Sequence, residues 1–289
     1  IILIAKYLSN HQLEVRESYI VIIPILIALL SSFLVLNQPD LGTAVIIFAP
    51  VLPMMLWAGV NGFTLFLLIA PLITIIAASN NIVFNIWGVL MFMIFLSFQG
   101  NFLRKIILYF VNIFAGLLFP FFWNDFLNGY QRQRFIDFLN PDLDPMGSSY
   151  HIIQSITAIG SGGLFGKGWG QGSQTQLKFL PVQESDFILS VIAEEFGVII
   201  LIGIILLYLV FSYRVLKKIN FTKNNNFKLI LVGSISIILL QTFIHIGVNI
   251  RMLPTTGMTM PFISYGGSSI VGTSILTGII LNLTKRKLN

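Results

Sequence analysis

Residues 186–211 read Asp186-Phe-Ile-Leu-Ser-Val-Ile-Ala-Glu-Glu-Phe-Gly-Val-Ile-Ile-Leu-Ile-Gly-Ile-Ile-Leu-Leu-Tyr-Leu-Val-Phe211. A run this long and this apolar spans a bilayer as an α-helix, because a helix pairs every backbone polar group internally where water is absent. Acidic residues stand only near its start, at Asp186, Glu194 and Glu195. The stretch therefore predicts a membrane helix with acidic groups toward one end.

The composition extends this prediction to the whole chain. Hydrophobic residues make up 56%, charged residues 10%, and the mean hydropathy is +0.88, whereas soluble domains carry about 25% charged residues. We predict an all-α polytopic membrane protein that forms one membrane domain over residues 1–289. Residues 1–8 resemble the end of a further helix, so we expect an N-terminal truncation. The complete spans are predicted at 19–36, 42–60, 62–79, 82–98, 106–123, 186–211, 229–247 and 268–284.

Basic residues fall unevenly on the two sides of the membrane when these spans alternate. The richer side is cytoplasmic by the positive-inside rule, which makes the long loop 124–185 extracytoplasmic. The net charge of +6 lies at span ends, where lipid headgroups are, so we expect the bilayer and no nucleic acid as a partner. The richer side holds Lys6, Arg16, Arg104, Lys105, Arg214, Lys217, Lys218, Lys223, Lys228, Lys285, Arg286 and Lys287; the other holds Arg132, Arg134, Lys167, Lys178 and Arg251.

The loop 124–185 carries most of the polar residues. A structureless loop of this length is improbable in a compact protein, and segment 150–160 has helical spacing. Seven glycines between Gly160 and Gly172 would let backbone amides approach a phosphate, although the spacing is not that of a Walker loop. A flexible linker is the alternative interpretation of this glycine-rich stretch.

Arg132 and Arg134 alternate with glutamines. In an extended chain their guanidinium groups would face the same way, and paired arginines suit the bidentate hydrogen bonds of a pyrophosphate. Attraction to anionic lipid headgroups is the alternative.

The acidic residues have both structural and functional interpretations. Asp186 stands at the N-terminus of the predicted span 186–211, and Asp40 precedes the span that begins at residue 42, so each is placed to act as an ordinary cap. Glu194 and Glu195 follow Asp186 by eight and nine residues, which places them about 12 Å further along the predicted helix and inside the membrane. Acids inside a membrane are costly and usually face a cavity or a partner. We therefore expect at least one glutamate to line a polar path or to form a buried ion pair.

Further polar residues lie on the same face of the membrane. Arg251 precedes a segment in which Pro254 and Pro261 prevent a regular helix, so this segment is expected to re-enter the membrane or line a cavity rim. Gln154 and Ser264 are assigned to a cavity or to structural polar contacts. His151 and His245 are isolated, which favours hydrogen-bonded structural histidines over zinc ligands. Cysteine is absent, which excludes disulfides.

Several motifs follow one another along the chain: Gln38-Pro-Asp-Leu-Gly-Thr-Ala44, Tyr130-Gln-Arg-Gln-Arg134, Asp144-Pro-Met-Gly147, Tyr150-His-Ile-Ile-Gln-Ser155, Ala158-Ile-Gly-Ser-Gly-Gly163, Asp186 through Gly197, Leu253-Pro254 and Ser264-Tyr-Gly-Gly-Ser268. In this order they resemble the SEDS family (shape, elongation, division and sporulation). The 150–155 motif is most similar to the branch that acts in cell elongation.

The resemblance implies a peptidoglycan glycosyltransferase that polymerises lipid II at the outer face of the bacterial cytoplasmic membrane. It implies that Asp186 is the base that activates the acceptor hydroxyl while a polyprenyl pyrophosphate departs. We expect Arg132, Arg134, Lys167 and Arg251 to stabilise that pyrophosphate. The metal requirement is unknown, and a divalent cation, Mg or Mn, is the one cofactor candidate. The expected partners are lipid II, the nascent glycan strand and a class B penicillin-binding transpeptidase.

Two departures from the family pattern are visible. The chain reads Pro181-Val-Gln-Glu-Ser-Asp186 where the family usually has Pro-Glu-x-His-Thr-Asp, and residues 62–105 hold two spans more than usual. Two other functions are considered: a flippase for lipid-linked precursors, in which the intramembrane glutamates form a polar path, and a non-catalytic scaffold for a transpeptidase.

Overall fold

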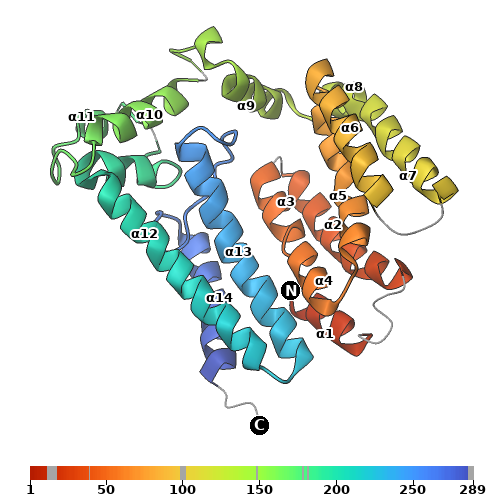
Figure 1. The fold of residues 1–289 in the computed structure, drawn as a ribbon. Coiled ribbons are helices and arrows are strands. Elements are labelled where there is room, and N and C mark those ends of the chain that lie inside the picture. The colour runs from red at the N-terminus through yellow and green to blue at the C-terminus, as the bar shows by residue number, and fades with distance from the viewer. Residues whose placement is uncertain are drawn as a thin grey trace. The chain divides into compact units, whose positions relative to one another are not determined.

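The computed structural model describes residues 1–11, 18–38, 40–97, 102–147, 149–177, 179–180 and 182–285. Within these ranges the regular structure is helical and contains no strand (Figure 1). The chain divides into two compact units, Ile1–Ala58 with Gln133–Asn289, and Gly59–Arg132. The single membrane domain stays a prediction. Outside the described residues lie Arg16, Pro39, Lys178, Pro181, Arg286 and Lys287.

The smaller unit is built from three apolar helices, α5 (Gly62–Ala77), α6 (Asn81–Ser97) and α7 (Phe102–Ala115). Short turns follow at η2 (Gly116–Leu118), α8 (Phe119–Phe121) and η3 (Phe122–Phe126). Ala70, Met91 and Phe95 form the buried core. The indole of Trp87 donates to the hydroxyl of Thr74 at 2.8 Å, which satisfies two polar groups inside this apolar unit.

The larger unit is organised around α13 (Asn225–Asn249), which packs against α1 (Ile2–Asn10), α4 (Val51–Ala58), α12 (Ile188–Phe221) and α14 (Gly267–Lys285) (Figure 1). The short η1 (Ser18–Val21) leads into α2 (Ile22–Leu36), which packs on α3 (Leu41–Phe48). Asp40 caps α3, because its carboxylate accepts from the Thr43 amide at 2.9 Å. Pro50 separates α3 from α4, since proline lacks the amide that would continue the helix.

The described helices confirm the predicted polytopic architecture. Five are long and apolar enough to cross a membrane, and three shorter apolar helices coincide with the remaining predicted spans. The five are Leu41–Ala58, Lys105–Asp125, Ile188–Phe221, Asn225–Asn249 and Gly267–Lys285; the three are Ile22–Leu36, Gly62–Ala77 and Asn81–Ser97.

The predicted loop 124–185 is largely helical. It contains α9 (Gly129–Leu139), η4 (Pro141–Leu143), α10 (Tyr150–Gly162) and α11 (Ser173–Gln176). The helical spacing at 150–160 is confirmed by α10. The extended conformation considered for Arg132 and Arg134 is wrong, because both belong to α9. Two residues along a helix turn through about 200°, so these side chains do not face the same way.

Helix α12 is broken at Gly197, which has φ 82° and ψ 171°. Residues Gly162–Gly168, which we call the glycine plug, supply the backbone hydrogen bonds that the break leaves open. The amides of Lys167 and Gly168 donate to the carbonyls of Glu194 and Glu195, each at 2.9 Å, and the amide of Val198 donates to the carbonyl of Gly163 at 3.0 Å. A break inside an apolar helix requires such replacement partners.

The glycines of the plug are required by the closeness of the two backbones. A Cβ built on Gly162 would lie 2.0 Å from the Ala193 carbonyl oxygen, and one on Gly166 would lie 2.2 Å from that of Glu195. No side chain fits at these distances. The flexible-linker interpretation of this stretch is therefore wrong, since the plug is fixed to α12 from both sides of the break.

Candidate functional site

Asp186 lies in the turn 182–187 that leads into α12. Its carboxylate oxygen Oδ1 accepts from the Ser185 hydroxyl at 2.9 Å. The cap position of α12 is occupied by Phe187, without a side-chain cap hydrogen bond. The interpretation of Asp186 as an ordinary helix cap is therefore wrong, and its carboxylate is not committed to the helix end.

Side chains from α13 and from the segment after it hold this turn in place. The Asn249 side-chain amide donates to the Asp186 carbonyl at 3.0 Å. The Ser264 hydroxyl donates to the Ser185 carbonyl at 2.6 Å, and His245 Nε2 lies 3.2 Å from the same oxygen. His245 is thus a hydrogen-bonded histidine inside the fold, and Ser264 is a structural polar contact.

A second set of buried polar groups joins three helices at the start of α12. The Ser190 hydroxyl donates to the Asn249 side-chain oxygen at 2.7 Å and lies 2.6 Å from the Ser155 hydroxyl. Ser155 also donates to the Asn249 carbonyl at 2.9 Å. Sequence reasoning missed Ser190 and Asn249. Their position in or at the end of apolar spans is the signal that could have found them, because buried polar groups need partners.

Arg134 and Asp186 converge on Gly257. A side chain built on Gly257, which has φ +69°, would meet Asp186 Oδ2 at 3.7 Å and Arg134 Nη2 at 3.8 Å. Arg134 is itself oriented by a hydrogen bond of 2.9 Å from Nη1 to the Thr255 carbonyl. A carboxylate and a guanidinium therefore flank one glycine that leaves the space between them open.

Burial raises the pKa of Asp186 above its ordinary value, against the smaller lowering effects of the Ser185 hydrogen bond and of the nearby Arg134 and His151 side chains. A carboxylate with a raised pKa is a stronger base than a free aspartate. Its burial therefore makes Asp186 a better proton acceptor than an exposed aspartate would be.

The remaining candidate cations are placed differently. Arg251 has a left-handed backbone conformation, with φ 57°, and its Nη2 donates to the Phe138 carbonyl at 3.4 Å. Together with the bond from Arg134 to Thr255, this gives two hydrogen bonds between α9 and the segment after α13, one donated from each. Lys167 forms an ion pair of 2.7 Å with Glu194. Arg132 belongs to the smaller unit, and its assignment to a pyrophosphate site stays a prediction.

Glu194 is fully buried and saturated with hydrogen bonds. Besides Lys167, its carboxylate accepts from the amides of Gln174 and Thr175 at 3.0 and 3.1 Å and from the Thr175 hydroxyl at 2.7 Å. It thus forms a buried ion pair and anchors α11. Glu195 is also buried, and Gln154 is half-buried on α10.

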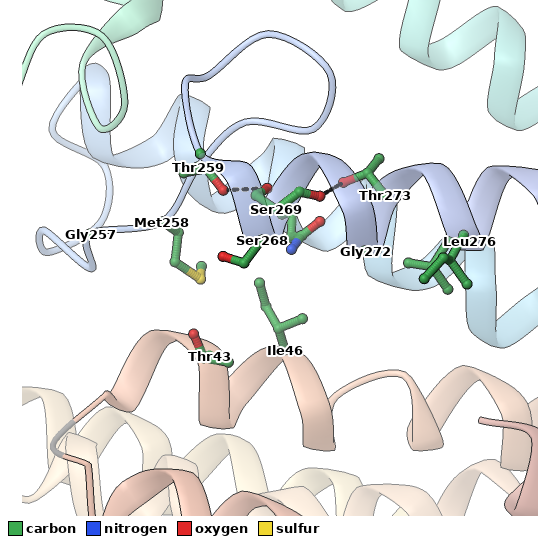
Figure 2. A pocket seen from close by; sticks show the side chains of 13 residues that line it. Thr43, Ile46, Gly257, Met258, Thr259, Ser268, Ser269, Gly272, Thr273 and Leu276 are labelled. Carbon is green, nitrogen blue, oxygen red and sulfur yellow. Dashed lines mark hydrogen bonds between the residues drawn. The ribbon is translucent and has the colours of Figure 1, made fainter.

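A pocket of about 560 Å³ extends from Gly257 between α3, α13 and α14 (Figure 2). Thr43 and Ile46 line it from α3, and α14 contributes small or hydroxyl-bearing residues together with Ile275 and Leu276. Figure 2 shows the hydroxyl of Thr259 bonded to that of Ser269, at 2.7 Å. The pocket is therefore partly apolar and partly lined by hydroxyls, and it adjoins the residue that Asp186 and Arg134 flank.

In the part of the chain that the structure describes, metal ligands do not gather near this site. Among the described residues there is no group of three or more His, Cys, Asp or Glu side chains that could hold an ion. The donor set around Asp186 fits a cation only if most of its ligands come from a bound phosphate, as is common for Mg²⁺.

These features define a polytopic membrane protein in which a carboxylate and a guanidinium flank one glycine at the edge of a pocket between apolar helices. The profile of the FtsW, RodA and SpoVE family, described as cell cycle protein, matches residues 1–97 and 82–289. The chain belongs to this family.

Relatives and a solved structure agree with this membership. The chain is 39% identical over 178 residues to the peptidoglycan glycosyltransferase MrdB of Escherichia coli K12, covering 61% of this chain and 48% of that protein. It is 31% identical to the peptidoglycan glycosyltransferase RodA of Treponema pallidum, covering 91% and 67%, and 31% identical to the stage V sporulation protein E of Bacillus subtilis, covering 98% and 65%.

The fold matches a solved chain of a peptidoglycan synthase complex, whose study concerns the coordination of polymerisation and crosslinking. The TM-score is 0.66 at 25% identity, over 98% of this chain and 66% of that one. The alignment with MrdB spans about half the length of that relative.

Proposed function

We propose that the protein is a peptidoglycan glycosyltransferase that polymerises lipid II during cell elongation. The observation that carries the proposal is Asp186: a partly buried carboxylate that caps no helix and that, together with Arg134, flanks Gly257, a residue lining a pocket between apolar helices. Its relatives MrdB and RodA are named peptidoglycan glycosyltransferases.

In the proposed reaction Asp186 takes the proton from a sugar hydroxyl of the acceptor. The hydroxyl oxygen forms a bond to the anomeric carbon of the donor, and the bond from that carbon to the pyrophosphate oxygen breaks. The polyprenyl pyrophosphate leaves with the electron pair. Arg134 and Arg251 stabilise its negative charge, as preorganised cations do for leaving phosphates.

Lys167 was predicted to contribute to this stabilisation, but its ammonium is held by Glu194. We therefore leave Lys167 out of the proposed pyrophosphate site. A divalent cation, Mg²⁺ or Mn²⁺, is proposed to bind through the pyrophosphate, since the described residues offer no acidic cage. The pocket beside Gly257 is proposed to receive part of the lipid-linked substrate.

The proposed location is the bacterial cytoplasmic membrane, with loop 124–185 outside. The charge bias of the predicted spans supports this orientation. The proposed partner is a class B penicillin-binding transpeptidase, and the similarity to a chain of a peptidoglycan synthase complex supports it.

The test reconstitutes the full-length protein with its transpeptidase and measures glycan polymer formed from lipid II. Asp186→Asn should lower the rate by about 10²–10⁴-fold, the usual contribution of a positioned base. Asp142→Asn, in the η4 turn of the same loop, is the matched control and should retain activity. Polymerisation by Asp186→Asn at the parent rate would refute the catalytic assignment.

The alternatives give different results in the same system. A flippase would move labelled lipid II between leaflets without producing polymer. A non-catalytic scaffold would support its transpeptidase equally well with Asp186→Asn.

A further inference from the structure

The glycine plug and the residues after it present large apolar side chains to the outside of the larger unit. Leu164, Phe165 and Trp169 are 63%, 81% and 80% exposed. The backbone that carries Leu164 and Phe165 is fixed by its hydrogen bonds to α12. Trp169 packs its ring edge-on against Phe196, with ring centroids 5.5 Å apart. These exposed side chains therefore project from backbone that is bonded to α12 or, for Trp169, from a ring that packs on α12.

The length of α12 indicates the depth at which this support lies. From Val198 to Tyr213 the helix contains no charged residue, a stretch of about 24 Å at the helical rise. Lys217 and Lys218 follow Arg214, and the distance from Gly197 to Lys217 is about 30 Å. A bilayer hydrocarbon core is also about 30 Å thick. If Lys217 and Lys218 lie at one boundary of the hydrocarbon core, the break at Gly197 lies at the opposite boundary.

Exposed apolar side chains also lie directly after the break in α12. Ile199, Ile200 and Ile202, directly after the break, are 48%, 48% and 49% exposed, as expected for side chains that contact lipid. Aromatic residues such as Trp169 are enriched where hydrocarbon meets headgroups. The one cation in residues 162–172, Lys167, is paired with Glu194, so this surface offers apolar area rather than charge.

We propose that Leu164, Phe165 and Trp169 insert into the boundary of the bilayer and anchor the glycine plug to the lipid surface. The anchor sets the depth of the break in α12. It binds by burying apolar area and does not require anionic lipid. This role is separate from the proposed transferase activity and is tested without it.

The test uses the full chain in lipid nanodiscs that contain brominated acyl chains. The difference in fluorescence between the parent and Trp169→Phe isolates the emission of Trp169, since the chain has four tryptophans. Bromines near the headgroups should remove most of this emission, bromines near the bilayer centre less, and aqueous iodide little. Strong quenching by iodide with none by lipid bromine, as for a water-exposed or protein-binding surface, would overturn the proposal.

A second measurement is independent of Trp169. The chain has no cysteine, so Phe165→Cys can carry a nitroxide, with Met146→Cys, 89% exposed, as the matched control. Collisions with oxygen, which concentrates in lipid, should dominate at position 165, and collisions with a water-soluble nickel complex at position 146. The pattern at 165 should be the same in zwitterionic and anionic lipid. Equal water accessibility at both positions, or lipid contact only in anionic bilayers, would contradict the anchor.

Discussion

Lys167 Nζ lies 2.7 Å from Glu194 Oε1, and this pair joins the glycine plug to the helix that it completes. Because Glu194 is fully buried, the substitution Lys167→Met should leave the negative charge of the Glu194 carboxylate without a cation. Breaking a buried pair costs about 3–5 kcal/mol, and the partial exposure of Lys167 places the expected loss at the lower end. The melting temperature in detergent measures the loss.

The double variant Lys167→Met with Glu194→Gln is the control for this pair. It should recover part of the stability, because it removes the uncompensated charge as well as its partner. If the loss in the double variant equals the sum of the losses in the two single variants, the ion pair itself contributes nothing.

Gly166→Ala tests the close approach of the plug to α12. The added methyl group would lie 2.2 Å from the Glu195 carbonyl oxygen, at a backbone φ of +78°. We expect a loss of about 1–3 kcal/mol, as for other overpacked sites, measured by thermal unfolding. Gly160→Ala is matched, since nothing lies within 4 Å of its Cβ position. Equal effects of the two substitutions would contradict the assigned role of the plug.

The rate of polymerisation should depend on the ionisation of Asp186. Only the ionised carboxylate accepts a proton, and burial raises its pKa, so activity should fall with decreasing pH earlier than an ordinary aspartate would require. Ser185→Ala removes a hydrogen bond that lowers this pKa. The acidic limb of the pH profile of kcat should therefore move to higher pH.

Thr157→Ala is the control for this shift, because its hydroxyl bonds the Ile153 carbonyl on the exposed side of α10. Its acidic limb should coincide with that of the parent. An unmoved limb in Ser185→Ala, or one moved to lower pH, would count against Asp186 as the titrating base.

Asn249→Ala should disturb the turn that carries Asp186. The substitution removes the donor to the Asp186 carbonyl and the acceptor of the Ser190 hydroxyl. Unsatisfied buried groups cost about 1–3 kcal/mol each, so we expect lower stability and a lower kcat with little change in KM. Asn226→Ala, whose side-chain oxygen has no partner, should change neither. A normal kcat in Asn249→Ala would mean that the turn does not depend on this amide.

The membrane helices could be predicted from the sequence because the bilayer fixes the length of an apolar span. The predicted span 62–79 corresponds to α5 at Gly62–Ala77, and 229–247 falls within α13 at Asn225–Asn249. The conformation of Tyr130–Arg134 was misjudged, since alternation with glutamine fits a strand as well as a helix when every position is polar. The direction in which the Arg134 side chain points became clear only from the position of Arg134 in α9.

The candidate site could be predicted only in part. Asp186 stood out through its motif and Arg134 through its charge. Gly257, Ser190 and Asn249 did not, because their roles come from contacts between residues far apart in the sequence. The glycine plug was visible only as a composition bias, since hydrogen bonds between residues 163 and 198 leave no local periodicity.

The break in α12 also determines which parts of the chain can be exchanged between relatives. The backbone groups of the plug and of residues 193–199 are hydrogen-bonded to one another. The two segments therefore form one structural unit, here called a cassette, although about thirty positions separate them in the sequence. A chimaera that imports the loop without the first turns of α12 would pair mismatched backbones. Deleting one residue from the plug would shift the whole bonding register. Insertions into residues 140–147, outside the cassette, would leave it intact.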